Sequence, residues 1–135
     1  MKKKMFVLAL LAGITMFSMH GAEAKKAEDS AGTPSYAVKA YYTSMAKADF
    51  AAAKKYLAAK ELIQMTTALE EMAKEDQELI DDTKKEFANS AKAKFISETI
   101  TGDKAVVVFS YQENGKTRKE THNLKKVNGV WLIED

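Results

Sequence analysis

The chain has 135 residues, of which 21 are basic and 19 acidic, and it contains no cysteine. This length suits a single domain with one hydrophobic core. The missing cysteines exclude disulfides and thiolate metal sites. The balanced charge offers none of the clustered Lys and Arg that neutralise phosphates, so we expect no nucleic-acid partner.

The first 24 residues predict a secretory signal peptide. Lys2, Lys3 and Lys4 form a basic start, residues 5–19 form an apolar run, and Ala22-Glu23-Ala24 is a small-x-small cleavage site. At about 1.5 Å per residue the run is too short to cross the ~30 Å hydrocarbon core of a membrane. A lipoprotein would need a cysteine at the cleavage point, so we expect no stable membrane anchor. The sequence therefore predicts cleavage after Ala24 and a periplasmic or secreted bacterial protein.

Removal of the signal peptide takes away three lysines and one glutamate, which leaves 18 basic and 18 acidic residues. Residues 25–32 are small and polar, and they predict a flexible leader. Residues 33–135 are then expected to form one domain of nearly neutral charge.

The first half of this domain is predicted to be helical, because no Gly or Pro lies between Pro34 and Gly102. Thr33 can cap a first helix in which Pro34 is the first residue. The inward face of this helix is an apolar stripe at helical spacing, formed by Val38, Tyr41, Tyr42 and Met45.

Further helical segments follow. Asp49 is expected to cap a short second helix, whose inward side chains are Phe50, Ala53 and Leu57. From about Ala59 the pattern fits two helices, or one bent helix, with a break near residues 75–77. The buried stripe is predicted to hold Leu62, Met65, Leu69 and Met72 before the break, and Leu79, Ile80 and Phe87 after it.

The segment from Glu61 to Glu86 is acidic, with nine acidic side chains against three lysines. It lacks the glycine and the alternating Asp or Asn ligands that an EF-hand requires. We interpret the segment as a solvated helix face and expect neither a metal nor a cofactor.

The last third of the chain predicts antiparallel strands joined by tight turns. Residues 94–101 alternate like a half-buried strand, and the next strand, residues 105–111, is apolar on both faces and is predicted to be central. The polar run 116–124 predicts a strand with one face in water. Asn114-Gly115 and Asn128-Gly129 predict the hairpin turns. In the final strand we expect Trp131 and Ile133 on one face and Leu132 on the other.

These elements carry a resemblance. The corner Ala48-Asp49-Phe50, the strand start Gly102-Asp103-Lys104-Ala105 and the ending Asn128-Gly129-Val130-Trp131-Leu132-Ile133 resemble the nuclear transport factor 2-like superfamily. The chain is similar, more narrowly, to a branch of small exported bacterial proteins related to lumazine-binding-like domains. The resemblance covers residues 33–134. Ala48 departs from it, because Gly commonly precedes the corner Asp.

The resemblance implies an α+β fold of the cystatin-like cone type, in which N-terminal helices pack on the concave face of a curved antiparallel sheet. Members of the superfamily use the cone as an enzyme active site, as a small-ligand pocket, or as a core that supports dimer formation. Fold alone does not choose among these uses.

A candidate pocket can be assembled from the aromatic and flexible side chains expected to face the cone. An apolar or aromatic small molecule is the ligand that such a lining suits. His122 is the one histidine left after signal removal, and it alternates in phase with Leu124. No Ser-His-Asp set, metal-ligand cluster or phosphate-binding glycine loop can be assembled, so we assign no catalytic residue. The candidate pocket residues are Tyr41, Met45, Phe95, Phe109, Tyr111, His122 and Trp131.

We therefore expect an exported, non-catalytic module that binds a small ligand or serves as an accessory domain. One alternative is a protein-interaction or homodimerisation module that uses the open face of the sheet. We expect charged residues on that face, which argues against a large apolar interface: Lys116, Arg118, Lys119, Glu120, Lys125 and Lys126. The other alternative is a small isomerase or dehydratase that uses the cone.

Overall fold

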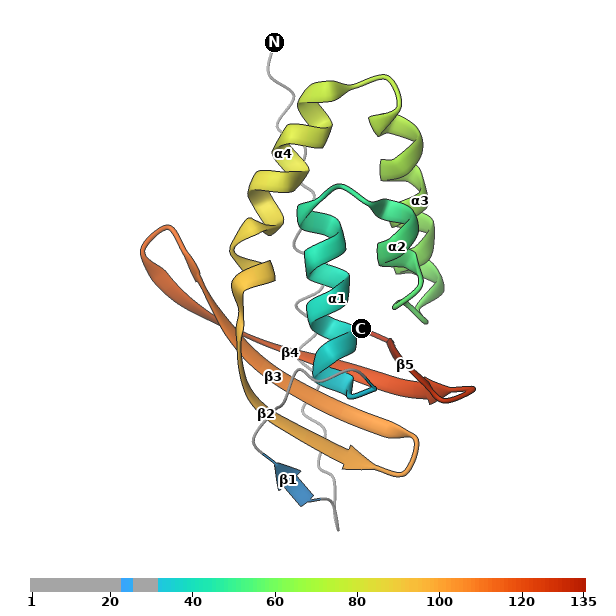
Figure 1. Ribbon diagram of the computed structural model, residues 1–135, viewed down its shortest axis with the longest axis vertical. Coiled ribbons are helices and arrows are strands. Elements are labelled where there is room, and N and C mark those ends of the chain that lie inside the picture. Colours follow the sequence, from blue (N-terminus) through green and yellow to red (C-terminus); the bar gives the residue numbers. More distant parts are fainter. Residues whose placement is uncertain (1–22, 26–31) are drawn as a thin grey trace.

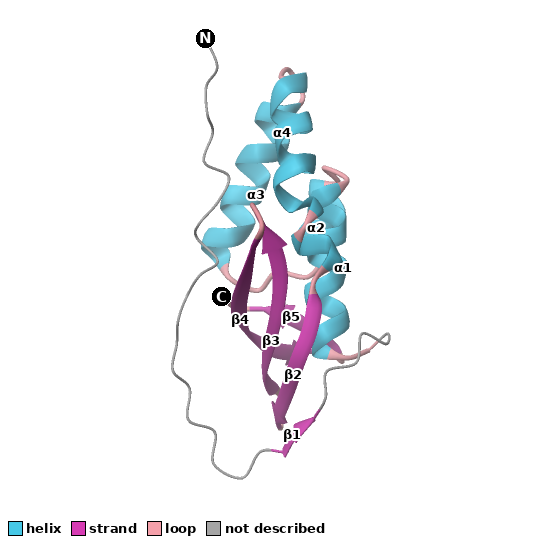
Figure 2. Cartoon of the chain, turned by 90° about the vertical axis from the view of Figure 1, so that its left-hand side faces the viewer, coloured by secondary structure: helices cyan, strands magenta, loops and turns pink. Residues whose placement is uncertain are grey.

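The computed structural model describes residues 23–25 and 32–135, as an α+β arrangement of four helices and a curved antiparallel sheet (Figure 1). This confirms the predicted fold class. The helices pack on the concave face of the sheet, and Figure 2 shows the two layers from the side. The elements are β1 (Glu23–Lys25), α1 (Pro34–Ala46), α2 (Phe50–Lys54), α3 (Lys60–Ala73), α4 (Gln77–Ala88), the short 3₁₀ helix η1 (Ser90–Lys92), β2 (Lys94–Thr101), β3 (Lys104–Glu113), β4 (Lys116–Val127) and β5 (Val130–Ile133).

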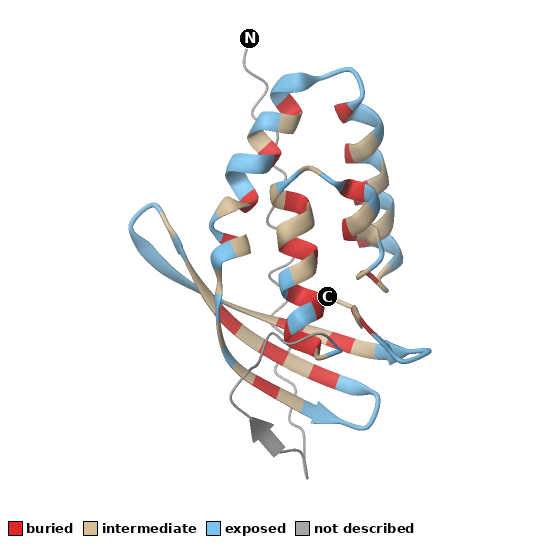
Figure 3. Ribbon diagram, viewed as in Figure 1, coloured by how far each residue is buried: buried red, intermediate tan, exposed pale blue. Residues whose placement is uncertain are grey.

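Helix α1 begins as its sequence predicts. The hydroxyl of Thr33 accepts a hydrogen bond from the amide of Tyr36 at 3.2 Å, and Pro34 occupies the first helical position, where it removes no bonded amide. The predicted stripe of Val38, Tyr41, Tyr42 and Met45 is buried, and Figure 3 shows buried positions along α1 facing the buried positions of the strands. Helix α1 is therefore the central helix of the core.

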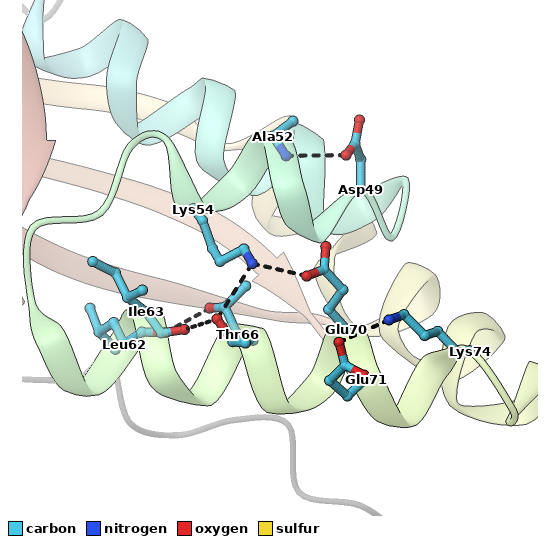
Figure 4. Close-up of polar contacts among 10 residues, drawn as sticks. Asp49, Ala52, Lys54, Leu62, Ile63, Thr66, Glu70, Glu71 and Lys74 are labelled. Carbon is cyan, nitrogen blue, oxygen red and sulfur yellow. Dashed lines mark hydrogen bonds and ion pairs between the residues drawn. The ribbon is translucent and has the colours of Figure 1, made fainter.

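The corner between α1 and α2 also follows the prediction. A carboxylate oxygen of Asp49 accepts from the amide of Ala52 at 3.1 Å and caps α2. Lys54 then joins α2 to α3, because its ammonium group lies 2.9 Å from a carboxylate oxygen of Glu70 and 3.4 Å from the hydroxyl of Thr67 (Figure 4). Phe50, Ala53 and Leu57 are buried, as expected.

Helices α3 and α4 are separate, with the break at the predicted place, and Asp76 caps α4 by accepting from the amide of Leu79 at 3.0 Å. The predicted stripe of α3 is partly wrong: Leu62 and Leu69 are buried, but Met65 is only half-buried and Met72 is 46% exposed. Thr66 and Ala73 take the inward positions instead.

The inward threonines have a simple physical basis. The hydroxyl of Thr66 donates to the carbonyl of Leu62 at 2.7 Å, and that of Thr83 on α4 donates to Leu79 at 2.7 Å. A hydroxyl bonded within its own helix can be buried without leaving a polar atom unpaired. Leu79 and Phe87 are buried as predicted, and Ile80 is half-buried.

The sheet has the strand order β1-β2-β3-β4-β5, with every neighbour antiparallel. Asn114 and Gly115 have φ angles of 51° and 76°, and Asn128 and Gly129 have 50° and 80°. These left-handed pairs form the predicted two-residue hairpin turns, which fix the register of β3 on β4 and of β4 on β5.

Two assignments of side chains to the faces of the sheet are corrected by the register. Strand β3 is central, but Val106 and Val108 on its second face are half-buried rather than covered. Of the charged residues predicted for the open face, only Lys119 and Lys125 alternate outward. Lys116, Arg118, Glu120 and Lys126 are in phase with the buried Leu124, so they point to the helical side.

Strand β2 departs from regular alternation because its register shifts between Phe95 and Ser97. This bulge leaves Ile96 46% exposed and places Glu98, which is 5% exposed, toward the core.

At the N-terminus, Glu23–Lys25 pairs with Ile100–Glu98 of β2 as strand β1, where no strand was predicted. The rest of the predicted signal peptide, and residues 26–31 of the predicted leader, lie outside the described residues. Within the described part of the chain, no helix is long and apolar enough to cross a membrane.

Ala48 generates a stability prediction. Its φ of 54° lies in the left-handed region, which costs an alanine about 1–2 kcal/mol. Ala48→Gly should therefore raise the free energy of unfolding by about 0.5–1 kcal/mol, measured by chemical denaturation. Ala51→Gly in α2 is the matched control, because the exposed Ala51 is helical, and it should lower stability by about 1 kcal/mol. Equal effects of the two substitutions would contradict this assignment of strain.

Candidate functional site

The candidate site centres on a buried histidine that links α1, β4 and the end of the chain. His122 lies on β4 and is fully buried. Its Nε2 atom is 2.7 Å from the hydroxyl oxygen of Tyr42 on α1, and its Nδ1 atom is 2.7 Å from the main-chain oxygen of Asp135. Both ring nitrogens are therefore bonded to the protein itself.

These partners determine the neutral tautomer of the ring. A main-chain oxygen can only accept, so Nδ1 carries the hydrogen and donates to Asp135. Nε2 is then the acceptor, and the hydroxyl of Tyr42 donates to it. Burial lowers the pKa of His122, partly opposed by Asp135, which favours the charged ring. Burial likewise raises the pKa of Tyr42 well above its usual value, and Tyr41 adds to this effect. The pair is thus neutral at physiological pH.

Aromatic rings enclose this hydrogen-bonded pair. The ring of Tyr42 lies 5.1 Å from Tyr41, 6.0 Å from Phe87 and 5.5 Å from Phe109, measured between centroids. The ring of His122 lies 5.4 Å from Phe109 in a stacked arrangement. Such contacts are worth about 0.5–1.5 kcal/mol each beyond the area they bury, so the centre of the predicted cone is held together by ring packing.

The structure divides the seven predicted pocket residues into two groups. Phe95 and Tyr111 are half-buried, and their rings lie 5.9 and 6.3 Å from that of Phe109. These two side chains remain accessible near the β3–β4 hairpin. Together with Glu120, to which Tyr111 is bonded, we call them the rim. The buried group belongs to the hydrophobic core or, for His122, to its polar centre: Tyr41, Met45, Phe109, His122 and Trp131.

At the rim, the hydroxyl of Tyr111 donates to a carboxylate oxygen of Glu120 at 3.4 Å. Burial raises the pKa of Tyr111, and the charges of Glu120 and Glu113 add to that effect. Burial is also the main cause of a raised pKa at Glu120 and at Glu86 on α4. The rim therefore combines two aromatic side chains with the partly buried carboxylate of Glu120.

Sequence reasoning missed a second buried polar contact. One carboxylate oxygen of Glu98 accepts from both the amide and the hydroxyl of Ser35, each at 2.9 Å. Ser35 lies in the first turn of α1, where unbonded amides and the helix dipole favour a negative charge. Glu98 is thus a remote cap that ties β2 to α1. Only a prediction of the bulge in β2 could have placed Glu98 toward the core.

Tyr42 was predicted as a core residue but was not included in the pocket. Its hydroxyl could have been paired with His122, because both residues were expected to face the cone and a buried tyrosine usually finds a partner. Among the described residues, no buried side-chain nitrogen or oxygen lacks a partner, and no group of three His, Asp or Glu side chains could hold a metal ion.

The lowered pKa of His122 predicts how stability depends on pH. Below about pH 6.5 the unfolded chain takes up a proton at this histidine more readily than the folded chain, so stability falls as pH falls. The contribution is complete above that pH. His122→Gln keeps a neutral hydrogen-bonding side chain at every pH, so the difference in unfolding free energy between parent and variant should shrink from pH 7.5 to pH 5.

Chemical denaturation across this range measures that difference, and the other titrating groups are common to both proteins. Tyr42→Phe is the control, because it keeps the histidine while removing its donor, and it should cost about 1–3 kcal/mol at pH 7.5. A parent-minus-variant difference that stays constant with pH would show that His122 does not titrate differently on folding.

No curated protein and no solved structure matches the chain. A family model described as a domain of unknown function, DUF4878, matches residues 26–134, which is nearly all of the predicted mature domain. Because this match covers more than half of the chain, the chain belongs to the DUF4878 family.

Proposed function

We propose that the chain is an exported, non-catalytic binding or accessory module with the cone shape of the nuclear transport factor 2-like superfamily. The arrangement of helices on the concave face of the sheet supports this shape. The basic, apolar and small-x-small segments before Lys25 support export to the periplasm or the medium.

One observation carries the non-catalytic part of the proposal: both nitrogens of His122 are bonded to the protein inside the core. A general acid or base must reach the proton that it transfers, within hydrogen-bond distance of the substrate. His122 could do so only after its bonds to Tyr42 and Asp135 break. The geometry therefore favours a structural role for the residue that an isomerase or dehydratase would use.

A small ligand, if the module binds one, is best placed at the rim. Phe95 and Tyr111 offer half-exposed aromatic faces, and the hydroxyl of Tyr111 and the carboxylate of Glu120 offer polar contacts. An aromatic molecule with one hydroxyl group could stack on the rings and bond to these atoms. Of the seven predicted pocket residues, the proposed ligand site therefore keeps the two accessible ones, Phe95 and Tyr111.

Thermal shift with phenol, p-cresol and indole tests the rim. A ligand that binds only the folded state stabilises it, by about 2.7 kcal/mol at a hundredfold excess over Kd. We expect a rise in melting temperature that depends on concentration, and Tyr111→Phe should reduce the shift by phenol and p-cresol. Tyr36→Phe is the matched control, because Tyr36 is an exposed tyrosine on α1, and it should leave the shifts unchanged.

If none of the three molecules shifts the melting temperature of the parent protein, the small-ligand proposal for the rim is wrong. The accessory role through a protein contact would then be the remaining form of the proposal. An equal loss of shift in Tyr36→Phe would also contradict the rim as the site.

A further inference from the structure

Strand β4 is longer than its neighbour β5, and this leaves part of its edge without a strand. Strand β5 pairs only with Leu124–Val127, and the amide of Glu134 reaches the carbonyl of Asn123. In the described part of the chain, the stretch from Lys116 to Thr121 pairs with β3 on one side and with no strand on the other. Figure 1 shows the β3–β4 hairpin extending beyond the rest of the sheet, and Figure 3 shows its tip as exposed.

The sequence of this edge is complementary to itself. Residues 117–121 read Thr-Arg-Lys-Glu-Thr, so an antiparallel copy centred on Lys119 sets Thr117 opposite Thr121 and Arg118 opposite Glu120. Each of these pairs occurs twice across the two-fold axis. Opposite charges and threonine pairs are both favourable directly across an antiparallel ladder.

The alternation of β4 assigns these pairs to the two faces. Arg118 and Glu120 are in phase with Leu124 and lie on the helical side, whereas Thr117, Lys119 and Thr121 lie on the open face. The present partner of Arg118 is Glu113, at 2.8 Å, and both side chains are about half exposed (58% and 43%). An ion pair as exposed as this one contributes little, so Arg118 can exchange it for a new partner at small cost.

We propose that the free edge of β4, Thr117–Thr121, pairs antiparallel with the same edge of a second copy of the chain. The two sheets then form one continuous sheet across the two-fold axis, with Arg118 of each copy beside Glu120 of the other. This contact joins the two sheets edge to edge, and Glu120 is the one residue that it shares with the rim.

One residue opposes the contact. The side chain of Lys119 meets its own copy at the axis, and lysines on edge strands generally discourage pairing. The dimer is therefore weak. Lys119→Thr removes the like-charge contact, so this substitution should strengthen the dimer and lower its dissociation constant by about tenfold. Lys94→Thr is the matched control, because Lys94 is an exposed lysine on β2, away from this edge, and it should have no effect.

Sedimentation equilibrium of the purified protein tests the proposal, from about 10 µM to about 1 mM, the range in which weak complexes dissociate. We expect a monomer–dimer equilibrium that Arg118→Glu weakens at least about tenfold, since it sets like charges opposite each other twice. The double exchange Arg118→Glu with Glu120→Arg restores opposite charges across the axis and should recover the dimer. Circular dichroism confirms that each variant is folded.

A protein that stays monomeric over this range, including as Lys119→Thr, overturns the proposal. So does a dimer that is insensitive to Arg118→Glu, or one that the double exchange fails to restore. Because ligand binding at the rim is measured by thermal shift on Tyr111, failure of that proposal leaves this one standing, and the reverse also holds.

Discussion

The position of α1 on the concave face of the sheet depends on two buried polar contacts. The carboxylate of Glu98 bonds to the first turn of the helix through Ser35, and the imidazole of His122 bonds to its middle through Tyr42. Both acceptors come from the sheet and both donors from α1. Buried polar groups are costly unless they are paired, so each contact admits only a narrow range of helix positions.

The rest of the core follows from this placement. With α1 fixed, the ring of Tyr42 contacts Tyr41, Phe87 and Phe109, and these contacts connect α4 and β3 to the central helix. The main-chain oxygen of Asp135 completes the bonding of His122, so the segment after β5 is part of the same arrangement. Tyr42 therefore has two roles: its hydroxyl forms the buried hydrogen bond to the sheet, and its ring packs against the aromatic core.

Local signals in the sequence predicted most of the fold. The caps Thr33 and Asp49, and the Asn-Gly turns, act through neighbouring residues, so their effects can be read from short segments. The errors arose where the position of a side chain depends on a backbone irregularity or on a hydrogen bond that the apolar pattern does not reveal. The bulge in β2 turned Glu98 inward, and a hydroxyl bond within α3 allowed Thr66 to be buried in place of its neighbour Met65.

The candidate site could be predicted only in part for the same reason. Periodicity placed Tyr41, Phe109 and His122 on the inner side, and they do lie there. Periodicity could not show that both ring nitrogens of His122 form hydrogen bonds within the protein, because Tyr42 is 80 residues away in sequence. It also could not separate the accessible Tyr111 from its buried neighbours, since that depends on how far the β3–β4 hairpin extends past the helices.

The role of the buried Glu98–Ser35 contact in holding α1 on the sheet is tested most directly by comparing the unfolding free energies of Glu98→Gln and Glu134→Gln. The first substitution removes the charge that accepts two buried hydrogen bonds from Ser35, and it should cost about 1–2 kcal/mol. The second removes the same charge from a surface pair with Lys104, and it should change stability by less than about 0.5 kcal/mol. If both variants unfold at the denaturant midpoint of the parent, then the buried contact does not hold α1 on the sheet.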